Sequence, residues 1–152
     1  MAAEYVAAEQ QISLNTPVVF SASIPCRKGI IYHEDGSGVF ILRGIVANPN
    51  ACFAQYVVTF NGNIAIPTGG AVTPIAVSIV ESGEPRPGST AIYTPAAVEE
   101  YGNVTSTSII KVPRGCCLTV AIEYVSGVTD GTTTPTPSIL VRNGNLTINR
   151  IA

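Results

Sequence analysis

The stretch LTVAIEY, residues 118–124, places Leu, Val, Ile and Tyr at every second position, with Thr, Ala and Glu between them. In an extended strand, successive side chains point to opposite faces. The stretch therefore predicts a β-strand with one buried face. Residues 55–60 alternate in the same way, and residues 75–79 predict a strand that is apolar on both faces.

Further alternating runs cover much of the chain and are separated by turn residues, which predicts about eight or nine short strands. The remaining runs are 12–24, 29–34, 38–46, 89–94, 103–113 and 138–150. Gly and Asn tolerate positive φ and Pro fixes it, so clusters of these residues predict turns. The predicted turns are 35–38, 61–63, 81–83, 85–88, 113–115 and 143–145. Residues 129–137, rich in Thr and Pro, predict an exposed loop that is the most variable and mobile part.

The composition also favours a single all-β domain. The 152 residues include 46% apolar and only 12% charged residues, with 14 Gly and 11 Pro. This length matches one domain with one core, and the β-branched residues among the apolar ones favour strands over helices. So few charges in an apolar chain indicate that some apolar surface is buried between subunits.

Charge and hydropathy also exclude several partners. A net charge of −2 with scattered basic residues lacks the basic patch that binds nucleic acid. No stretch reaches the 18 apolar residues of a membrane span, so membrane insertion is not expected. Residues 1–11 have neither the basic start nor the apolar core of a secretory signal, so we expect synthesis in the cytoplasm.

The predicted domain boundary lies between residues 11 and 12. Residues 1–11, rich in Ala, Glu and Gln, predict an N-terminal arm that is either a short helix or extended. An isolated helix of this length is marginal in water. Residues 12–152 form the predicted sandwich domain.

From Ile12 onward the order of strands and turns resembles a known family. The residues that carry the resemblance are ISLNTPVVFS (12–21), VTFNGNIAIPTGG (58–70), SIVESGEPRPGS (78–89) and GNLTINRIA (144–152). They resemble the trimeric jelly roll of tumour necrosis factors and of the globular heads of complement-type collagen-like proteins. Within that group they are most similar to the C-terminal heads of bacterial collagen-like spore-surface glycoproteins. The closing stretch resembles a central strand of such heads.

The resemblance implies a two-sheet jelly-roll sandwich of about 8–10 strands and a homotrimer with aromatic and aliphatic residues along its axis. Residues 26–44 and 94–120 also resemble small phage and prophage proteins of gut Gram-positive bacteria. The sequence differs from the spore-surface proteins because it has no Gly-X-Y collagen stem and no signal peptide. This difference favours a virion component over a spore protein.

The four cysteines, Cys26, Cys52, Cys116 and Cys117, allow three interpretations. Free cysteine is among the most buried residue types, so we expect small buried side chains, with one of the adjacent Cys116 and Cys117 in the core. A disulfide from Cys26 or Cys52 to Cys116 or Cys117 is a second possibility. Zinc binding is the third, although no C-x-x-C pair is present.

The titratable residues do not assemble into a predicted active site. His33, the only histidine, lies beside Glu34 and Asp35 in what we interpret as a polar hairpin tip. A Ser-His-Asp triad would have only Asp35 and Asp130 to draw on, and no nucleophile motif is present. The run Glu99-Glu100-Tyr101 predicts a solvated loop, with a helical turn or a cation site on the three-fold axis as alternatives. We therefore predict no catalytic, cofactor-binding or metal-binding residues.

These observations predict a non-enzymatic virion structural protein of a phage, either a capsid decoration or a fibre-head module. The homotrimer would bind a capsid or other virion protein through residues 1–11. The alternative is a receptor- or glycan-binding adhesin head on a phage, cell or spore surface. Its only near-loop aromatic candidates are Tyr32, Tyr93 and Tyr101, and loops so poor in aromatic residues disfavour a glycan site. The predicted core centres on Tyr56, Phe60, Val120, Ile122, Leu146 and Ile148.

Overall fold

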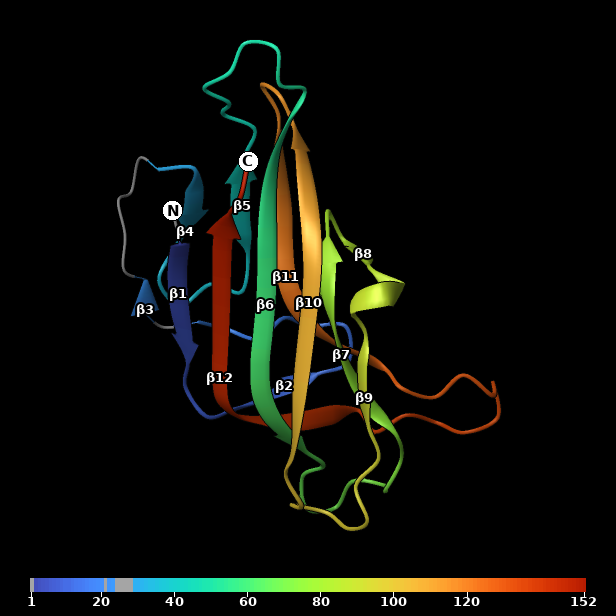
Figure 1. The fold of residues 1–152 in the computed structure, drawn as a ribbon. Helices are drawn as coiled ribbons and strands as arrows, with labels where there is room; N and C mark the ends of the chain where they lie inside the picture. Colours follow the sequence, from blue (N-terminus) through green and yellow to red (C-terminus); the bar gives the residue numbers. More distant parts are fainter. Residues whose placement is uncertain (1, 21, 24–28) are drawn as a thin grey trace.

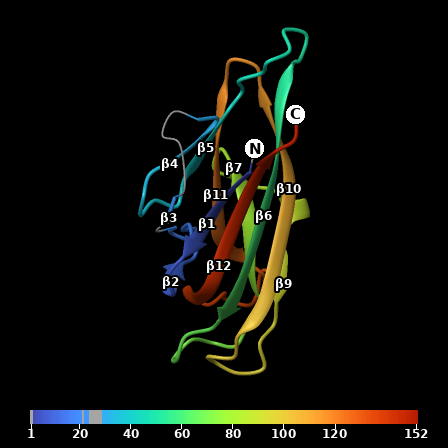
Figure 2. The same cartoon turned by 60° about the vertical axis from the view of Figure 1, so that its left-hand side comes forward.

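The chain folds into two antiparallel sheets packed face to face (Figures 1 and 2). The computed structural model describes residues 2–20, 22–23 and 29–152. Sheet A has the strand order β10-β6-β12-β1-β3, and β2 also pairs with β12. Its strands are β1 (Ala2–Ala7), β2 (Gln10–Ser13), β3 (Ala22–Ser23), β6 (Phe53–Ala65), β10 (Gly102–Pro113) and β12 (Ser138–Arg150).

Sheet B has the strand order β4-β5-β11-β7-β8, and β9 also pairs with β7. Its strands are β4 (Ile31–His33), β5 (Phe40–Arg43), β7 (Ile75–Glu81), β8 (Glu84–Pro85), β9 (Ala91–Tyr93) and β11 (Cys117–Ser126). A short 3-10 helix, η1 (Pro87–Ser89), connects β8 to β9. The architecture is the predicted all-β jelly-roll sandwich.

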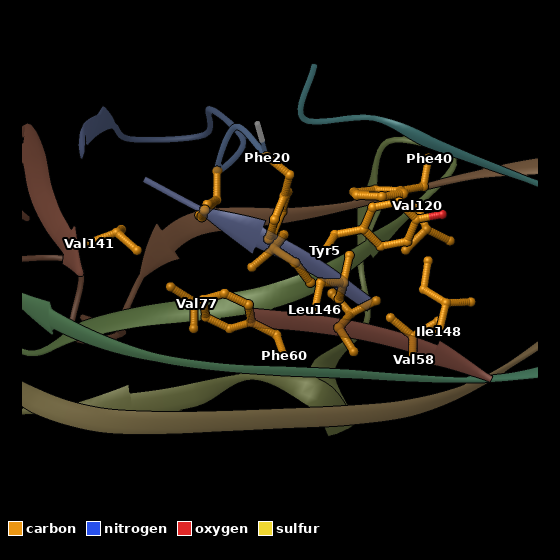
Figure 3. Packing of buried hydrophobic residues seen from close by; sticks show 14 of the residues in the cluster. Tyr5, Phe20, Phe40, Val58, Phe60, Val77, Val120, Val141, Leu146 and Ile148 are labelled. Atoms are coloured by element: carbon orange, nitrogen blue, oxygen red, sulfur yellow. The ribbon is translucent and has the colours of Figure 1, made fainter. Parts of the chain in front are cut away.

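The core lies between the two sheets and contains the predicted residues. Tyr56, Phe60, Val120, Ile122, Leu146 and Ile148 are all fully buried, and Figure 3 shows several of them. The alternation that predicted β11 holds, because its outward positions are the more exposed ones at Thr119 and Glu123. As predicted, β7 is buried on both faces. No helix in the described part of the chain is long and apolar enough to cross a membrane.

The predicted central position of the last strand is also confirmed. Strand β12 pairs with β6 on one side and with β1 and β2 on the other. It therefore joins the N-terminal and middle parts of sheet A. The C-terminal residues continue along β6, since the Ile151 amide donates to the Gln55 carbonyl over 2.9 Å.

Two predicted turns lie inside strands instead. Residues 61–63 belong to β6, and residues 143–145 form a bulge in β12, where Asn143 has φ 56°. Both glycines are needed for space: a Cβ on Gly62 would lie 2.8 Å from the Phe60 ring, and one on Gly144 would lie 2.9 Å from the Ala7 Cβ. These glycines therefore make room for the core within a strand.

The prediction that residues 1–11 form an arm separate from the sandwich is also wrong for residues 2–11. Residues 2–7 form β1, which pairs with β12 from Ala2↔Asn149 to Ala7↔Gly144 and also with β3. Tyr5 is only 1% exposed, and its ring centroid lies 4.6 Å from that of Phe40. Because β1 and β2 complete sheet A, the sandwich includes residues 2–11, and this segment is not a free docking arm.

The predicted strand at 12–24 is interrupted. Strand β2 ends at Ser13, Asn15 has φ 62°, and Pro17 forms only an isolated bridge to Glu123. Proline lacks the N–H that a continuous strand ladder requires. The segment therefore passes from sheet A to the edge of β11 in sheet B before β3.

Replacing Tyr5 by alanine tests the role of β1. We expect Tyr5→Ala to lower the free energy of unfolding by about 3–5 kcal/mol, the usual cost of truncating a large buried aromatic side chain. Urea denaturation followed by circular dichroism measures this change. The matched control is Glu9→Ala, which removes only a solvent-exposed pair with Arg142 at 3.4 Å and should change stability by no more than about 0.5 kcal/mol. Equal effects of the two substitutions would contradict the placement of β1 in the core.

Candidate functional site

The outer face of sheet A, the side turned away from sheet B, is the most distinctive surface of the molecule. Strands β12, β6 and β10 run side by side across it (Figure 1). Because their inward positions are buried, the alternate positions form this face. It divides into two parts of different chemistry.

The polar half consists of hydroxyl and amide side chains. Its centre is a row of three threonines, because Thr59 pairs with Thr107 on one side and with Thr147 on the other. Around this row lie further residues of the same kind. The polar half comprises Thr59, Asn61, Asn63, Asn103, Thr105, Thr107, Asn145, Thr147 and Asn149.

Hydrogen bonds between side chains of neighbouring strands order the polar half. The side-chain amide of Asn103 donates from Nδ2 to Asn61 Oδ1 over 2.8 Å, and the Thr105 hydroxyl donates to the same oxygen over 3.1 Å. The Thr107 hydroxyl donates to Thr59 Oγ1 over 3.3 Å. The side chains are therefore held in place before any partner binds, which reduces the entropy that binding would cost.

The apolar half continues the same face toward the end of the molecule where the chain terminates. It comprises Phe53, Val57, Ile109 and Ile151. Val57 pairs with Ile109, and Phe53, Ile109 and Ile151 are 46%, 49% and 50% exposed. Several large apolar side chains gathered on one open sheet face mark an interaction surface.

Charge is sparse on this face. Glu4 of β1 lies beside Thr147 and accepts a hydrogen bond from the side-chain amide of Asn145. Among the described outward-facing residues of β6, β10 and β12, only Lys111 and Arg142 are charged. Lys111 pairs with Gln55 across the strands, and Arg142 lies within 3.4 Å of Glu9. Burying such a surface does not require many ions to lose their water.

Comparisons with known proteins support the fold alone. No protein-family model matches the chain, and no curated protein matches it. Among solved structures, the globular domain of zebrafish complement 1qA protein is similar over 99% of this chain and 97% of its own, with 12% identity and a TM-score of 0.63. Eiger TNF from S. frugiperda is similar over 100% of this chain and 92% of its own, with 9% identity and a TM-score of 0.66.

Murine APRIL at pH 5.0 is similar over 99% of this chain and 98% of its own, with 9% identity and a TM-score of 0.63. The chain therefore has the jelly-roll fold of complement C1q and tumour necrosis factor heads. At this level of identity the likeness does not define a ligand or partner.

His33 lies at the end of β4, before the connection to β5. Its Nε2 lies 2.9 Å from the Ser37 carbonyl oxygen and therefore donates a hydrogen bond. Its ring stacks on Phe40 with centroids 4.2 Å apart. Asp35 is exposed in the turn, and Asp130 lies in the distant loop 127–137. Among the described residues, His33 contacts Ser37 and Phe40, and no hydrogen bond joins it to Asp35 or Asp130.

The loops 66–74 and 94–101 meet at the bottom of the molecule in Figure 1. The Glu99 amide donates to the Ile66 carbonyl over 2.7 Å, and the Thr68 hydroxyl donates to Glu99 Oε1 over 2.8 Å. Glu99 has φ 58°, an uncommon value for a residue other than glycine. The run at 99–101 is a loop, as predicted. Within the described residues, no group of three or more His, Cys, Asp or Glu could hold a metal ion.

The predicted aromatic contacts do not form a common platform. The Arg142 guanidinium lies over the Tyr101 ring, 5.0 Å from its centroid. Tyr93 packs so closely on Gly102 that a Cβ there would lie 2.4 Å from its ring. Tyr32 is 38% exposed on β4, in the other sheet from Gly102. The first two rings are thus engaged within the chain.

The prediction of buried cysteines is wrong for those that the structure describes. Cys52, Cys116 and Cys117 are exposed and free. Cys52 precedes β6, Cys116 follows the turn after β10, and Cys117 occupies an outward position of β11. Turn positions and the outward phase of the strand explain their exposure. Cys26 lies outside the described residues.

The loop 127–137 contains a local structure that the sequence analysis missed. Asp130 accepts hydrogen bonds from the amides of Thr132 and Thr133, over 3.0 and 2.9 Å, and from the Thr133 hydroxyl over 2.7 Å. These bonds lower the pKa of Asp130 from 3.8 to about 2. The run Asp130-Gly131-Thr132-Thr133 could have predicted this turn, because an Asp side chain commonly accepts hydrogen bonds from backbone amides two or three residues later.

The Asp130 turn leads to a pH prediction. Because the folded-state pKa is depressed, the stabilising bonds are fully present above pH 3.8 and are lost as the pH falls through about 2. NMR titration of the Asp130 carboxyl should show a midpoint near 2, with the Thr132 and Thr133 amide shifts following it. A midpoint near the ordinary 3.8 would contradict the turn.

Proposed function

We propose that the chain is a non-enzymatic head module of a phage particle, a capsid decoration or fibre head, and that it assembles as a homotrimer. The copies associate through the outer face of sheet A. The observation that carries this proposal is that the apolar and polar halves of this face contain no charged residue of their own.

Magnitudes indicate that both halves contribute. Burying each ~100 Å² of apolar surface contributes about 2.5 kcal/mol, at about 25 cal/mol per Å², and the apolar half consists of four side chains that are at most half exposed. Association costs on the order of 4–15 kcal/mol in lost motion. The apolar half alone is therefore marginal, and a stable assembly needs the polar half as well. Its preordered hydroxyls and amides would exchange water for hydrogen bonds with another copy.

The phage assignment rests on different support. It is the expected resemblance of residues 26–44 and 94–120 to small phage and prophage proteins, which no family model or curated protein matches. The uncharged apolar and polar halves suit a subunit of a larger assembly. The jelly-roll fold is compatible with this role, although it also serves many others.

A receptor-binding head is a second candidate function, and the pair of joined loops at the bottom of the molecule in Figure 1 favours it. The two loops 66–74 and 94–101 are fixed to each other through Glu99, and they expose Val72 and Val98. Such a rigid loop pair suits recognition of a partner. Tyr93 and Tyr101 are engaged within the chain, which disfavours a glycan platform. Strong saturable binding to a glycan array would reverse this ranking.

Charged substitutions on the central threonine row test the proposed assembly. We expect the wild-type protein to sediment as a trimer at micromolar concentration. The double variant Thr59→Lys with Thr147→Lys should sediment as a monomer, because two ammonium groups per copy would have to lose their water at the contact. Sedimentation velocity measures both.

Thr119→Lys provides the matched control, since Thr119 is an exposed outward position of β11 in sheet B. This variant should remain trimeric. Circular dichroism should show the same fold for all three proteins. A monomeric wild type, or equal dissociation by Thr119→Lys, would refute the proposed surface.

A separate experiment tests membership of a phage particle. Phage particles produced by a bacterial host that encodes this chain should be purified on a density gradient and digested with trypsin. We expect them to yield peptides of this chain in proportion to a capsid subunit. Detection of the peptides only in the particle-free fractions would contradict the virion role while leaving the assembly intact.

A further inference from the structure

The loop before β6 and the turn between β10 and β11 lie at one end of the sandwich, at the top of Figure 1. These segments and the start of β11 carry three exposed thiols. Backbone hydrogen bonds join the segments that carry them. The Arg114 amide donates to the Cys52 carbonyl over 2.9 Å, and the Gly44 amide donates to the Cys116 carbonyl over 2.8 Å. The backbone amide of Cys116 donates to the Pro113 carbonyl over 3.0 Å and so closes the turn between β10 and β11. These bonds therefore fix the backbone positions of Cys52 and Cys116 relative to each other and to β5.

The loop, turn and outward strand positions of these thiols leave them open to solvent within one copy. Free cysteine is normally among the most buried residue types, and an exposed thiol is open to oxidation. The three sulfurs are free of disulfides, and they belong to no group that could hold a metal among the described residues. An exposed group of thiols suggests chemistry between copies.

The positions of the thiols differ relative to the proposed contact. Cys52 directly precedes Phe53 of the apolar half, and it lines a groove of about 460 Å³ with Phe53 and Arg150. Cys116 follows β10, the edge strand of sheet A. Cys117 is an outward residue of β11 and so faces away from sheet A. Cys52 and Cys116 thus border the proposed contact, and Cys117 does not.

We propose that Cys52 of one copy forms a disulfide with Cys116 of the next copy when the assembly meets an oxidising environment. This inference rests on the proposed homotrimer. A cyclic trimer uses head-to-tail contacts, in which each copy presents two different surfaces. Each copy would donate one thiol to each neighbour, so three disulfides would close a covalent ring at this end. Pairing of Cys52 with Cys52 could join only two copies.

The oxidant is a small disulfide such as oxidised glutathione. The thiolate of one cysteine attacks it, forms a mixed disulfide and releases one reduced glutathione. The thiolate of the neighbouring copy then attacks the protein sulfur and releases the second glutathione. The two protein thiols lose two electrons and two protons in total, and one oxidised glutathione becomes two reduced molecules.

Non-reducing gel electrophoresis tests this inference. Every protein carries Cys26→Ser, so that only the three described cysteines can react. After incubation with oxidised glutathione, we expect a band at three times the monomer mass that dithiothreitol converts to monomer. Cys52→Ser and Cys116→Ser should each abolish this band. Cys117→Ser should retain it.

Sedimentation of the same samples separates the two proposals. If the reduced protein is a trimer but oxidation yields only monomer or dimer bands, the covalent ring is refuted and the proposed assembly stands. Loss of the band in Cys117→Ser with its retention in Cys116→Ser would also refute the assigned pair. A reduced protein that sediments as a monomer and yields no covalent trimer would refute both proposals.

Discussion

Close packing between the two sheets is the constraint on which the rest of the structure depends. Tyr56, Phe60 and Leu146 of sheet A fill the space against Phe40 and Val120 of sheet B. Because side chains alternate along a strand, this packing also determines which residues sheet A presents to the outside. A shift of one residue would bury the threonines and expose the aromatic rings. The core and the outer face are thus set by the same register.

The same packing accounts for the features that interrupt the strands. Gly62 and Gly144 leave room for the Phe60 ring and for Ala7, and the bulge at 143–145 bends β12 without ending it. Tyr5 then reaches the core from β1. The N-terminal strand is therefore a structural part of sheet A.

Alternation and turn residues predicted most of the fold, since long strands such as β10 and β12 have regular patterns and a buried face. Two features were outside their reach. Strand β1 is half alanine and shows no strand pattern, and Asn-Gly-Asn is ambiguous between a turn and a space-making glycine. The alternation at 118–124 does place Cys117 on the outward side, but the prediction followed the general tendency of free cysteine to be buried. The outer face was foreseen only as buried apolar surface between subunits, because its threonines and asparagines come from three strands distant in sequence.

Hydroxyl-radical footprinting tests most directly whether the outer face of sheet A is a contact between copies. In the assembled wild-type protein, Phe53 and Ile109 should be modified slowly, although each is about half exposed in a single copy. Ile92, which is 59% exposed on β9 of sheet B, should be modified rapidly and serves as an internal reference. Disrupting the threonine row should bring Phe53 and Ile109 to rapid modification. Rapid modification of both in the wild-type protein would contradict the account.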